Sequence, residues 1–124
     1  TAPVPAAAGA AQAGIQAVQS DEGANRTARL WKRVAEFHSA ISHPPTAIPS
    51  AIVPLIIGDE SAAVTAATKL REHGLFVPAI RYPTVARGSA RLRVTLTAAH
   101  TPADVLALTH ALGHIGHPQS AIGN

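Results

Sequence analysis

An alternating stretch in the last third of the chain is the feature that most restricts the fold. Between residues 91 and 97, Arg91 and Arg93 alternate with Leu92 and Val94, and two threonines continue the polar positions. Because successive side chains of a strand point to opposite faces of a sheet, this segment predicts a strand with one apolar, packed face and one cationic, accessible face. A guanidinium can hold two oxygens at once, so the cationic face suits a carboxylate or a phosphate.

Periodicity and capping signals around this strand predict a small α+β domain. Helices are expected over about residues 6–20, 25–39 and 61–73 and from 102 to Gly113 or Gly116, and strands over about residues 51–57, 76–80 and 91–97. Asp59 or Ser61 is expected to cap the third helix, and Gly74 to end it. For this order of elements, the economical packing is a mostly antiparallel sheet with the helices on one face.

Three local features carry more specific expectations. The near-continuous apolar run at residues 51–57 predicts a central strand that is covered on both faces. The acidic pair and glycine at residues 21–23 predict a break between the first two helices. The charged residues of the second helix are expected to form a solvated surface. These residues are Arg26, Arg29, Lys32, Arg33 and Glu36.

Composition excludes several classes of function. The chain has 124 residues and no cysteine, so disulfides, thiol catalysis and cysteine-based metal sites are absent. Its net charge of +3 is scattered along the sequence, which argues against a nucleic-acid surface. It contains no run of about 20 apolar residues, so no membrane partner is expected. We expect a cytoplasmic protein.

The segment from Ala79 to His100 resembles a known family. It follows the pattern A-I-R-P-P-T-V-P-x-G-T-A-R-L-R-x-T-L-T-A-A-H of the α-oxoamine synthases, which are pyridoxal-phosphate enzymes of aminotransferase fold type I. Tyr82, Ala86 and Ser89 depart from this pattern, and the arginines do not. The strand at residues 52–59 is similar to the I-V-P-x-I-x-G-D strand of the same family.

The resemblance implies that the chain is the C-terminal part of such an enzyme. Residues 1–43 would then be the end of the large domain with its linking helices, 44–117 the small domain, and 118–124 a tail. Neither Lys32 nor Lys69 matches the family's Schiff-base lysine motif. The resemblance therefore implies no catalytic residue here, a pyridoxal phosphate held mainly by the missing large domain, and a homodimer.

The resemblance also assigns roles to individual residues. Arg93, the second arginine of A-R-L-R, would bind the carboxylate of the amino acid, and Arg81 and Tyr82 would border the acyl entrance. Thr1 would reach the cofactor phosphate of the neighbouring subunit. Within the family, the residues are most similar to those of members that condense L-alanine with a pimeloyl thioester, with loss of carbon dioxide.

Two alternatives remain open on the sequence. The first is a glycine-using member of the family, namely 2-amino-3-ketobutyrate CoA ligase or 5-aminolevulinate synthase. The second is a stand-alone anion-binding module that uses the same arginine face without chemistry.

Other candidate groups are expected to be structural. His110, His114 and His117 have a spacing on the last helix that is compatible with a metal, but no acidic partner joins them, so no metal is expected. His100 is expected to bond local backbone at least as readily as substrate. The carboxylates of each adjacent acidic pair point apart, so an acid–base dyad is not expected. These pairs lie at residues 21–22 and 59–60. Thr84 and Ser89 lack a base and are expected to be turn residues.

Overall fold

A computed structural model describes residues 2, 4–41 and 49–115 of the chain. Along the sequence the elements are α1 (Pro5–Gln19), α2 (Asp21–Ala40), β1 (Ile52–Gly58), α3 (Glu60–Glu72), β2 (Ala79–Ile80), β3 (Ala90–Thr95) and α4 (Pro102–Ile115). The expected α+β class is confirmed, and so are the four helices and their order.

The three strands form an antiparallel sheet in the order β1-β3-β2, with β3 in the centre. The expectation that residues 51–57 form the central strand is wrong, because β1 lies at an edge. The carbonyl of Ala51 accepts the amide of Leu96 at 2.8 Å, so alternate residues of β1 direct their amides away from β3. Pro54, which has no amide hydrogen, occupies one of these outward positions and fits an edge strand.

β2 is shorter than the sequence predicts. It contains Ala79 and Ile80 rather than residues 76–80. The carbonyl of Pro78 still accepts the amide of Arg93 at 3.0 Å, but Pro78 has no amide with which to continue the ladder. The preceding residues therefore leave the edge of β3 without pairing as a strand.

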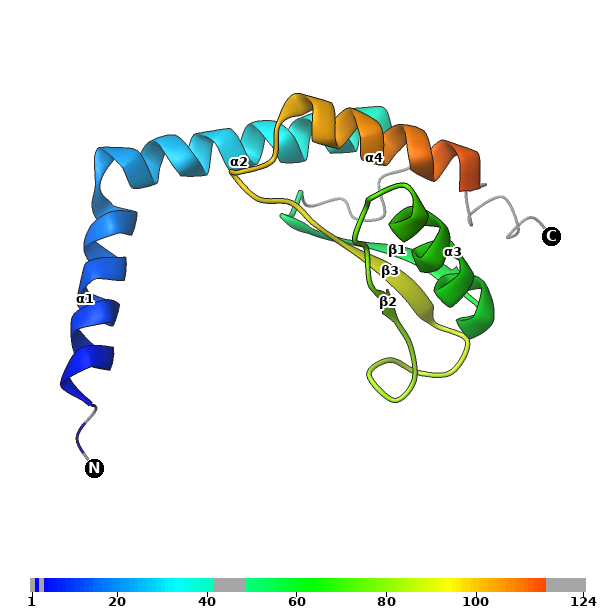
Figure 1. Ribbon diagram of the computed structural model, residues 1–124, viewed down its shortest axis with the longest axis horizontal. Coiled ribbons are helices and arrows are strands. Elements are labelled where there is room, and N and C mark those ends of the chain that lie inside the picture. The colour runs from blue at the N-terminus through cyan, green and yellow to red at the C-terminus, as the bar shows by residue number, and fades with distance from the viewer. Residues whose placement is uncertain (1, 3, 42–48, 116–124) are drawn as a thin grey trace.

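Three helices cover one face of the sheet, as predicted. α3 packs against all three strands, while α2 and α4 pack against each other above the same face (Figure 1). The core between these layers combines side chains from α2, β1, α3, β3 and α4. Its most deeply buried large side chains are Phe37, Leu70, Leu92, Val34, Val53 and Val94.

The corner between α1 and α2 lies earlier than expected. The break is at Ser20, whose hydroxyl accepts the amide of Gly23 at 3.2 Å, so residues 21–23 form the first turn of α2. A Cβ on Gly23 would lie 2.4 Å from the carbonyl oxygens of Ala17 and Val18, and a glycine is therefore needed where the two helices meet. Beyond this corner α1 projects away from the rest of the molecule and buries none of its residues (Figure 1).

One charged residue of α2 is not solvated as predicted. Arg33 is only 7% exposed, whereas Arg26, Arg29 and Lys32 are exposed. Arg33 precedes Phe37 by one helical turn and therefore lies on the core side of α2. Its Nη2 donates to Oε1 of Glu36 at 2.9 Å, which supplies a partner for the buried charge.

The helix ends follow their capping signals. Oδ1 of Asp59 accepts the amide of Ala62 at 2.7 Å at the start of α3, and Gly74 follows that helix with a φ of 76°. α4 continues through Gly113, the first of the two glycines expected to end it, to Ile115. Among the described residues, no helix is both long and apolar enough to cross a membrane.

Candidate functional site

The open face of the sheet carries the arginines that the sequence predicted for it. On β3, Leu92 and Val94 are each 2% exposed and face the helices, while Arg93 and Thr95 are exposed on the opposite side. The register places Arg93 across from Pro54 of β1. The alternation thus produces the apolar face and the cationic face that were expected.

The two arginines of β3 have different surroundings. Arg91 is half-buried, and its Nε donates to the carbonyl of Ser89 at 3.1 Å. It lies between Ile56 of β1 and Ile80 of β2 in the register. The side chain of Arg93 is exposed and makes no hydrogen bond or ion pair with any residue that the structure describes. Arg93 is therefore the arginine whose guanidinium is available to a carboxylate.

The turn between β2 and β3 forms a second part of this surface. Residues 81–89 project beyond the end of the sheet, opposite α2 and α4 (Figure 1). Tyr82 is 50% exposed, and the guanidinium of Arg87 lies 4.3 Å from the centre of its ring. Arg81 is also exposed, and it borders a hollow with Glu60 at the start of α3.

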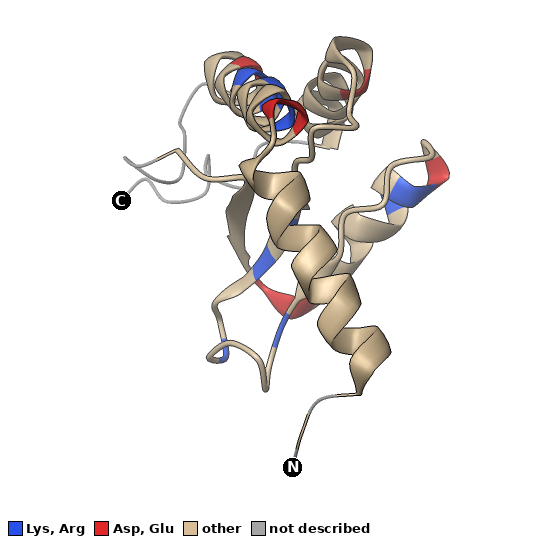
Figure 2. Ribbon diagram, turned by 90° about the vertical axis from the view of Figure 1, so that its left-hand side faces the viewer, with Lys and Arg blue, Asp and Glu red and all other residues tan. Residues whose placement is uncertain are grey.

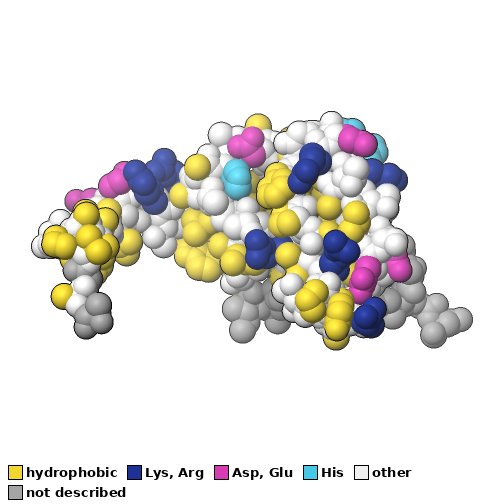
Figure 3. Space-filling view, turned by 60° about the horizontal axis from the view of Figure 1, so that its bottom comes forward, with side chains coloured by type: hydrophobic (Ala, Val, Ile, Leu, Met, Phe, Trp, Pro, Cys, Tyr) yellow, Lys and Arg dark blue, Asp and Glu magenta, His cyan; other side chains and the backbone are white. Residues whose placement is uncertain are grey.

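The sequence around these residues has one sign of charge. Residues 73–103 contain four arginines and neither aspartate nor glutamate. Basic residues accordingly mark both the sheet and the turn in the ribbon (Figure 2), and cationic side chains lie among hydrophobic ones in the space-filling view (Figure 3). This distribution favours an anionic ligand that also carries apolar groups.

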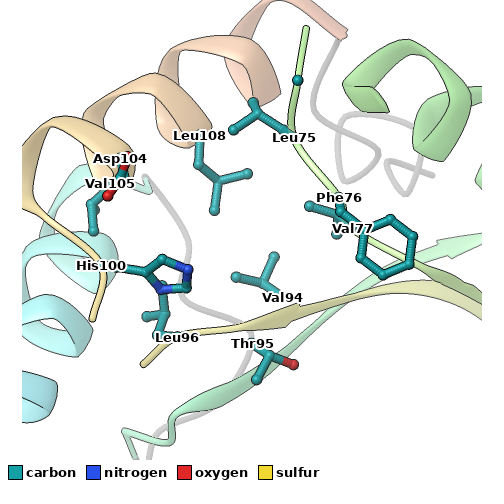
Figure 4. A pocket seen from close by; sticks show the side chains of 11 residues that line it. Leu75, Phe76, Val77, Val94, Thr95, Leu96, His100, Asp104, Val105 and Leu108 are labelled. Atoms are coloured by element: carbon teal, nitrogen blue, oxygen red, sulfur yellow. The ribbon is translucent and has the colours of Figure 1, made fainter. Parts of the chain in front are cut away.

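A groove that the sequence did not reveal opens next to β3. It has a volume of about 380 Å³ and is lined by the segment after α3, the end of β3 and the first turns of α4 (Figure 4). Phe76 at its border is 73% exposed. The sequence signal that would have revealed the groove is Pro78, because the ladder that ends there leaves a gap beside β3.

His100 bonds local backbone in this groove. Its Nδ1 accepts the amide of Thr97 at 3.0 Å. Nearby, the amide and the hydroxyl of Thr101 donate to Oδ2 of Asp104 at 2.7 and 2.8 Å. These two hydrogen bonds lower the pKa of Asp104. Both side chains therefore have structural partners at the start of α4.

The remaining candidates have structural surroundings or lie outside the described residues. The rings of His110 and His114 are 4.5 Å apart, and within the described part of the chain no three potential ligands form a metal site. Asp59 caps α3. Oε1 of Glu22 accepts a hydrogen bond from Nε of Arg26 at 2.7 Å, and this bond lowers the pKa of Glu22. Thr1, His117 and the expected boundary between residues 43 and 44 lie outside the described residues.

The described residues suit a carboxylate better than a cofactor ring. Neither lysine lies on the arginine face, because Lys32 is on α2 and Lys69 is on α3, which packs on the opposite face. No carboxylate occurs between residues 73 and 103 to pair with a ring nitrogen. The arginine face therefore suits an anion, and neither lysine lies on this face.

Solved structures share this fold. A serine palmitoyltransferase from Sphingomonas wittichii matches with a TM-score of 0.66 and 29% identity over 77% of this chain and 25% of its own. A high-resolution structure of SPT with PLP gives the same TM-score at 27% identity, over 76% of this chain and 25% of its own. The 8-amino-7-oxononanoate synthase from Francisella tularensis shares the fold with a TM-score of 0.56 and 24% identity, over 75% and 26%. The expected fold, that of fold type I enzymes, is confirmed.

Curated sequences give a closer relationship. No protein-family model matches the chain. The 8-amino-7-oxononanoate synthase of Klebsiella pneumoniae (strain 342) is 47% identical over 118 residues, which are 92% of this chain and 31% of the relative. That of Marinomonas sp. (strain MWYL1) is 44% identical over 115 residues, which are 90% and 28%. Over about nine-tenths of its length, the chain is therefore related in sequence to a segment of the 8-amino-7-oxononanoate synthases that makes up less than a third of those proteins.

Proposed function

We propose that the chain is the C-terminal, substrate-anchoring part of a pyridoxal-phosphate-dependent acyltransferase. The enzyme would condense L-alanine with pimeloyl-CoA or a pimeloyl-carrier protein, with loss of carbon dioxide, and give 8-amino-7-oxononanoate for biotin synthesis. The relatives that share 43% to 47% identity with the chain support this reaction by their names. The observation that carries the proposal is the exposed guanidinium of Arg93 on the open face of the sheet.

In this proposal Arg93 holds the carboxylate of alanine. Its fork of N–H donors matches two carboxylate oxygens, and its place in the central strand fixes the direction in which the side chain leaves the backbone. Binding of this kind accelerates a reaction by positioning, because the amino acid is held in one orientation while the acyl donor approaches. Arg81 and Tyr82, at the exposed turn, border the path of the acyl donor.

The missing parts of the enzyme supply the rest of the chemistry. Pyridoxal phosphate, held by the large domain, would stabilise the negative charge that develops at the α-carbon of alanine. Thr1 would contact the cofactor phosphate of the partner subunit in a cytoplasmic homodimer.

The exposed helix α1 supports the existence of such a partner. Ile15 and Val18 are exposed on it, and Trp31 is exposed on the neighbouring α2. Exposed apolar side chains of this size favour association. We propose that the large domain covers α1 in the enzyme, and we expect the 124-residue chain alone to self-associate in sedimentation. A monomer at all concentrations would contradict this assignment of α1.

A comparison of amino acids tests the reaction. The full-length protein, loaded with pyridoxal phosphate, is incubated with pimeloyl-CoA and either alanine or glycine, and the product is identified by mass spectrometry. We expect 8-amino-7-oxononanoate from alanine. Turnover of glycine, either here or in parallel assays with acetyl-CoA and succinyl-CoA, would assign the protein to a sister enzyme. No turnover with any donor would favour an anion-binding module without chemistry.

A second measurement tests whether the 124-residue chain binds pyridoxal phosphate without the large domain. The 124-residue chain alone should show no stoichiometric visible absorbance band with pyridoxal phosphate, because neither lysine lies on the arginine face. A stable band assigned by peptide mapping to Lys32 or Lys69 would contradict the proposal.

A further inference from the structure

We infer that the turn at residues 81–89 binds a phosphate group of the acyl donor, with Arg87 as the contact residue. This inference rests on the proposed function and deepens it, because it names the part of the thioester that the turn recognises. The ligand chemistry is the phosphate of a pantetheine arm or of the nucleotide attached to it.

The turn is rigid enough to present a binding group. The carbonyl of Arg81 accepts the amide of Thr84 at 3.0 Å, and the carbonyl of Ala86 accepts that of Ser89 at 3.1 Å. Gly88 has a φ of 74°, which lets the chain turn back into β3. The bond from Arg91 to the Ser89 carbonyl fixes the end of the turn to the strand.

Arg87 is held in place without losing its donors. Its guanidinium lies 4.3 Å from the centre of the Tyr82 ring. A guanidinium stacked on an aromatic face keeps its N–H groups free at its edge, where they can donate to phosphate oxygens. Among the residues that the structure describes, the side chain of Arg87 has no ion-pair partner. Arg81 differs, because Glu60 lines the same hollow and offsets part of its charge.

The distance between the turn and Arg93 places the turn near a distant group of the thioester rather than near its reacting carbon. A strand rises about 3.3 Å per residue, so the start of β3 at Ala90 lies about 10 Å from Arg93, and the turn lies further out. If Arg93 holds the carboxylate of the amino acid, the thioester carbon must lie near it. The turn can then reach a group that leads away from the thioester carbon, which is either the phosphate-bearing arm or the pimeloyl chain with its terminal carboxylate. The donor without a phosphate distinguishes the two, because it keeps the carboxylate.

Kinetics with three donors test this inference in the full-length enzyme. The donors are pimeloyl-CoA, pimeloyl-phosphopantetheine and pimeloyl-pantetheine, and the last has no phosphate. We expect Arg87→Ala to raise KM about 1.4- to 5-fold for a phosphorylated donor, which is the range of an exposed charge pair, and to leave KM for pimeloyl-pantetheine and every kcat unchanged. The rise should shrink with added salt.

A matched control comes from the other stacked arginine of the chain. Arg71 lies 5.1 Å from the centre of the Phe76 ring and belongs to α3, away from the turn. Arg71→Ala should change KM for none of the donors. Tyr82→Ala should reproduce part of the Arg87→Ala effect, because the ring orients the guanidinium.

The donors also identify which phosphate is bound. A rise for pimeloyl-CoA alone supports contact with the nucleotide, and a rise for pimeloyl-phosphopantetheine as well supports contact with the pantetheine phosphate that carrier proteins share. An equal rise for all three donors, or no rise for any, would overturn the inference. Calorimetric titration with free CoA measures the same phosphate contact without turnover.

If the enzyme makes no product, the proposed reaction fails. Unchanged CoA binding in Arg87→Ala would separately refute the phosphate contact.

Discussion

The two faces of strand β3 show how neighbouring residues can have separate tasks. Leu92 is buried beneath the helices, and Arg93, the next residue, is exposed on the open face. Both are held by the same backbone ladder between β1 and β2. The buried face therefore contributes to stability through packing, whereas the open face can change its side chains at little cost to the fold.

This division explains why an anchor residue belongs on a central strand. The ladder fixes the direction of the Arg93 side chain, and the buried face beneath it keeps the strand in register, because a slip by one residue would exchange the two faces. A loop would hold the same guanidinium with less precision. Three experiments test the contrast between the faces.

The largest expected effect is on stability. Leu92→Ala should lower the free energy of unfolding by about 2–5 kcal/mol, because it leaves a cavity in a packed core. Arg93→Ala should change it by no more than about 0.5 kcal/mol, since the side chain is exposed. Urea unfolding of the two variants measures both values. Similar losses for both would mean that the open face is also a packing surface.

The next effect concerns binding of the amino acid. Arg93→Ala in the full-length enzyme should weaken alanine binding by roughly 10- to 150-fold, because a hydrogen bond to a charged group contributes about 1.5–3 kcal/mol. Arg93→Lys should bind alanine more weakly than the native enzyme but better than Arg93→Ala, since lysine keeps the charge without the fork. The absorbance change of the cofactor on addition of alanine gives the dissociation constant.

Arg91→Ala is the control for this prediction. Arg91 shares the face with Arg93, but its Nε is already bonded to the Ser89 carbonyl, so its loss should weaken alanine binding less. If alanine affinity falls in Arg91→Ala and not in Arg93→Ala, the anchor has been assigned to the wrong arginine.

The smallest effect on stability is expected at the start of α4, where Thr101 and Asp104 are both exposed. Thr101→Ala should lower the free energy of unfolding by about 1 kcal/mol, as the loss of a helix cap typically does, and urea unfolding measures this loss.

The pKa of Asp104 is lowered in the folded protein, so its ionised form stabilises the fold above the unfolded pKa of about 3.9. This contribution to stability is lost as the pH falls. Urea unfolding at neutral pH should therefore show a loss for Asp104→Asn that disappears in acid. A loss that persists at pH 2 would show that the charge is not its source.

Sequence reasoning succeeded where the signal was local. The alternation of β3, the Asp59 cap and the glycine after α3 each depend on a few adjacent residues, and each is found as predicted. It failed where the outcome depends on distant neighbours. The apolar run of β1 was placed in the centre of the sheet, although Pro54 already indicated an edge. Arg33 was placed in solvent, because the charge pattern does not show what packs against α2.

The candidate site divides in the same way. The sequence by itself determined which residues of β3 share a face, because the period of a strand is a property of the backbone. Only the tertiary structure decided that Arg91 is bonded to Ser89 while Arg93 stays accessible, and that Arg87 stacks on Tyr82. Those relationships depend on how the turn folds back and on which strands flank β3. The partners are close in sequence, but the alternation of a strand does not show which side chains meet when the turn folds back.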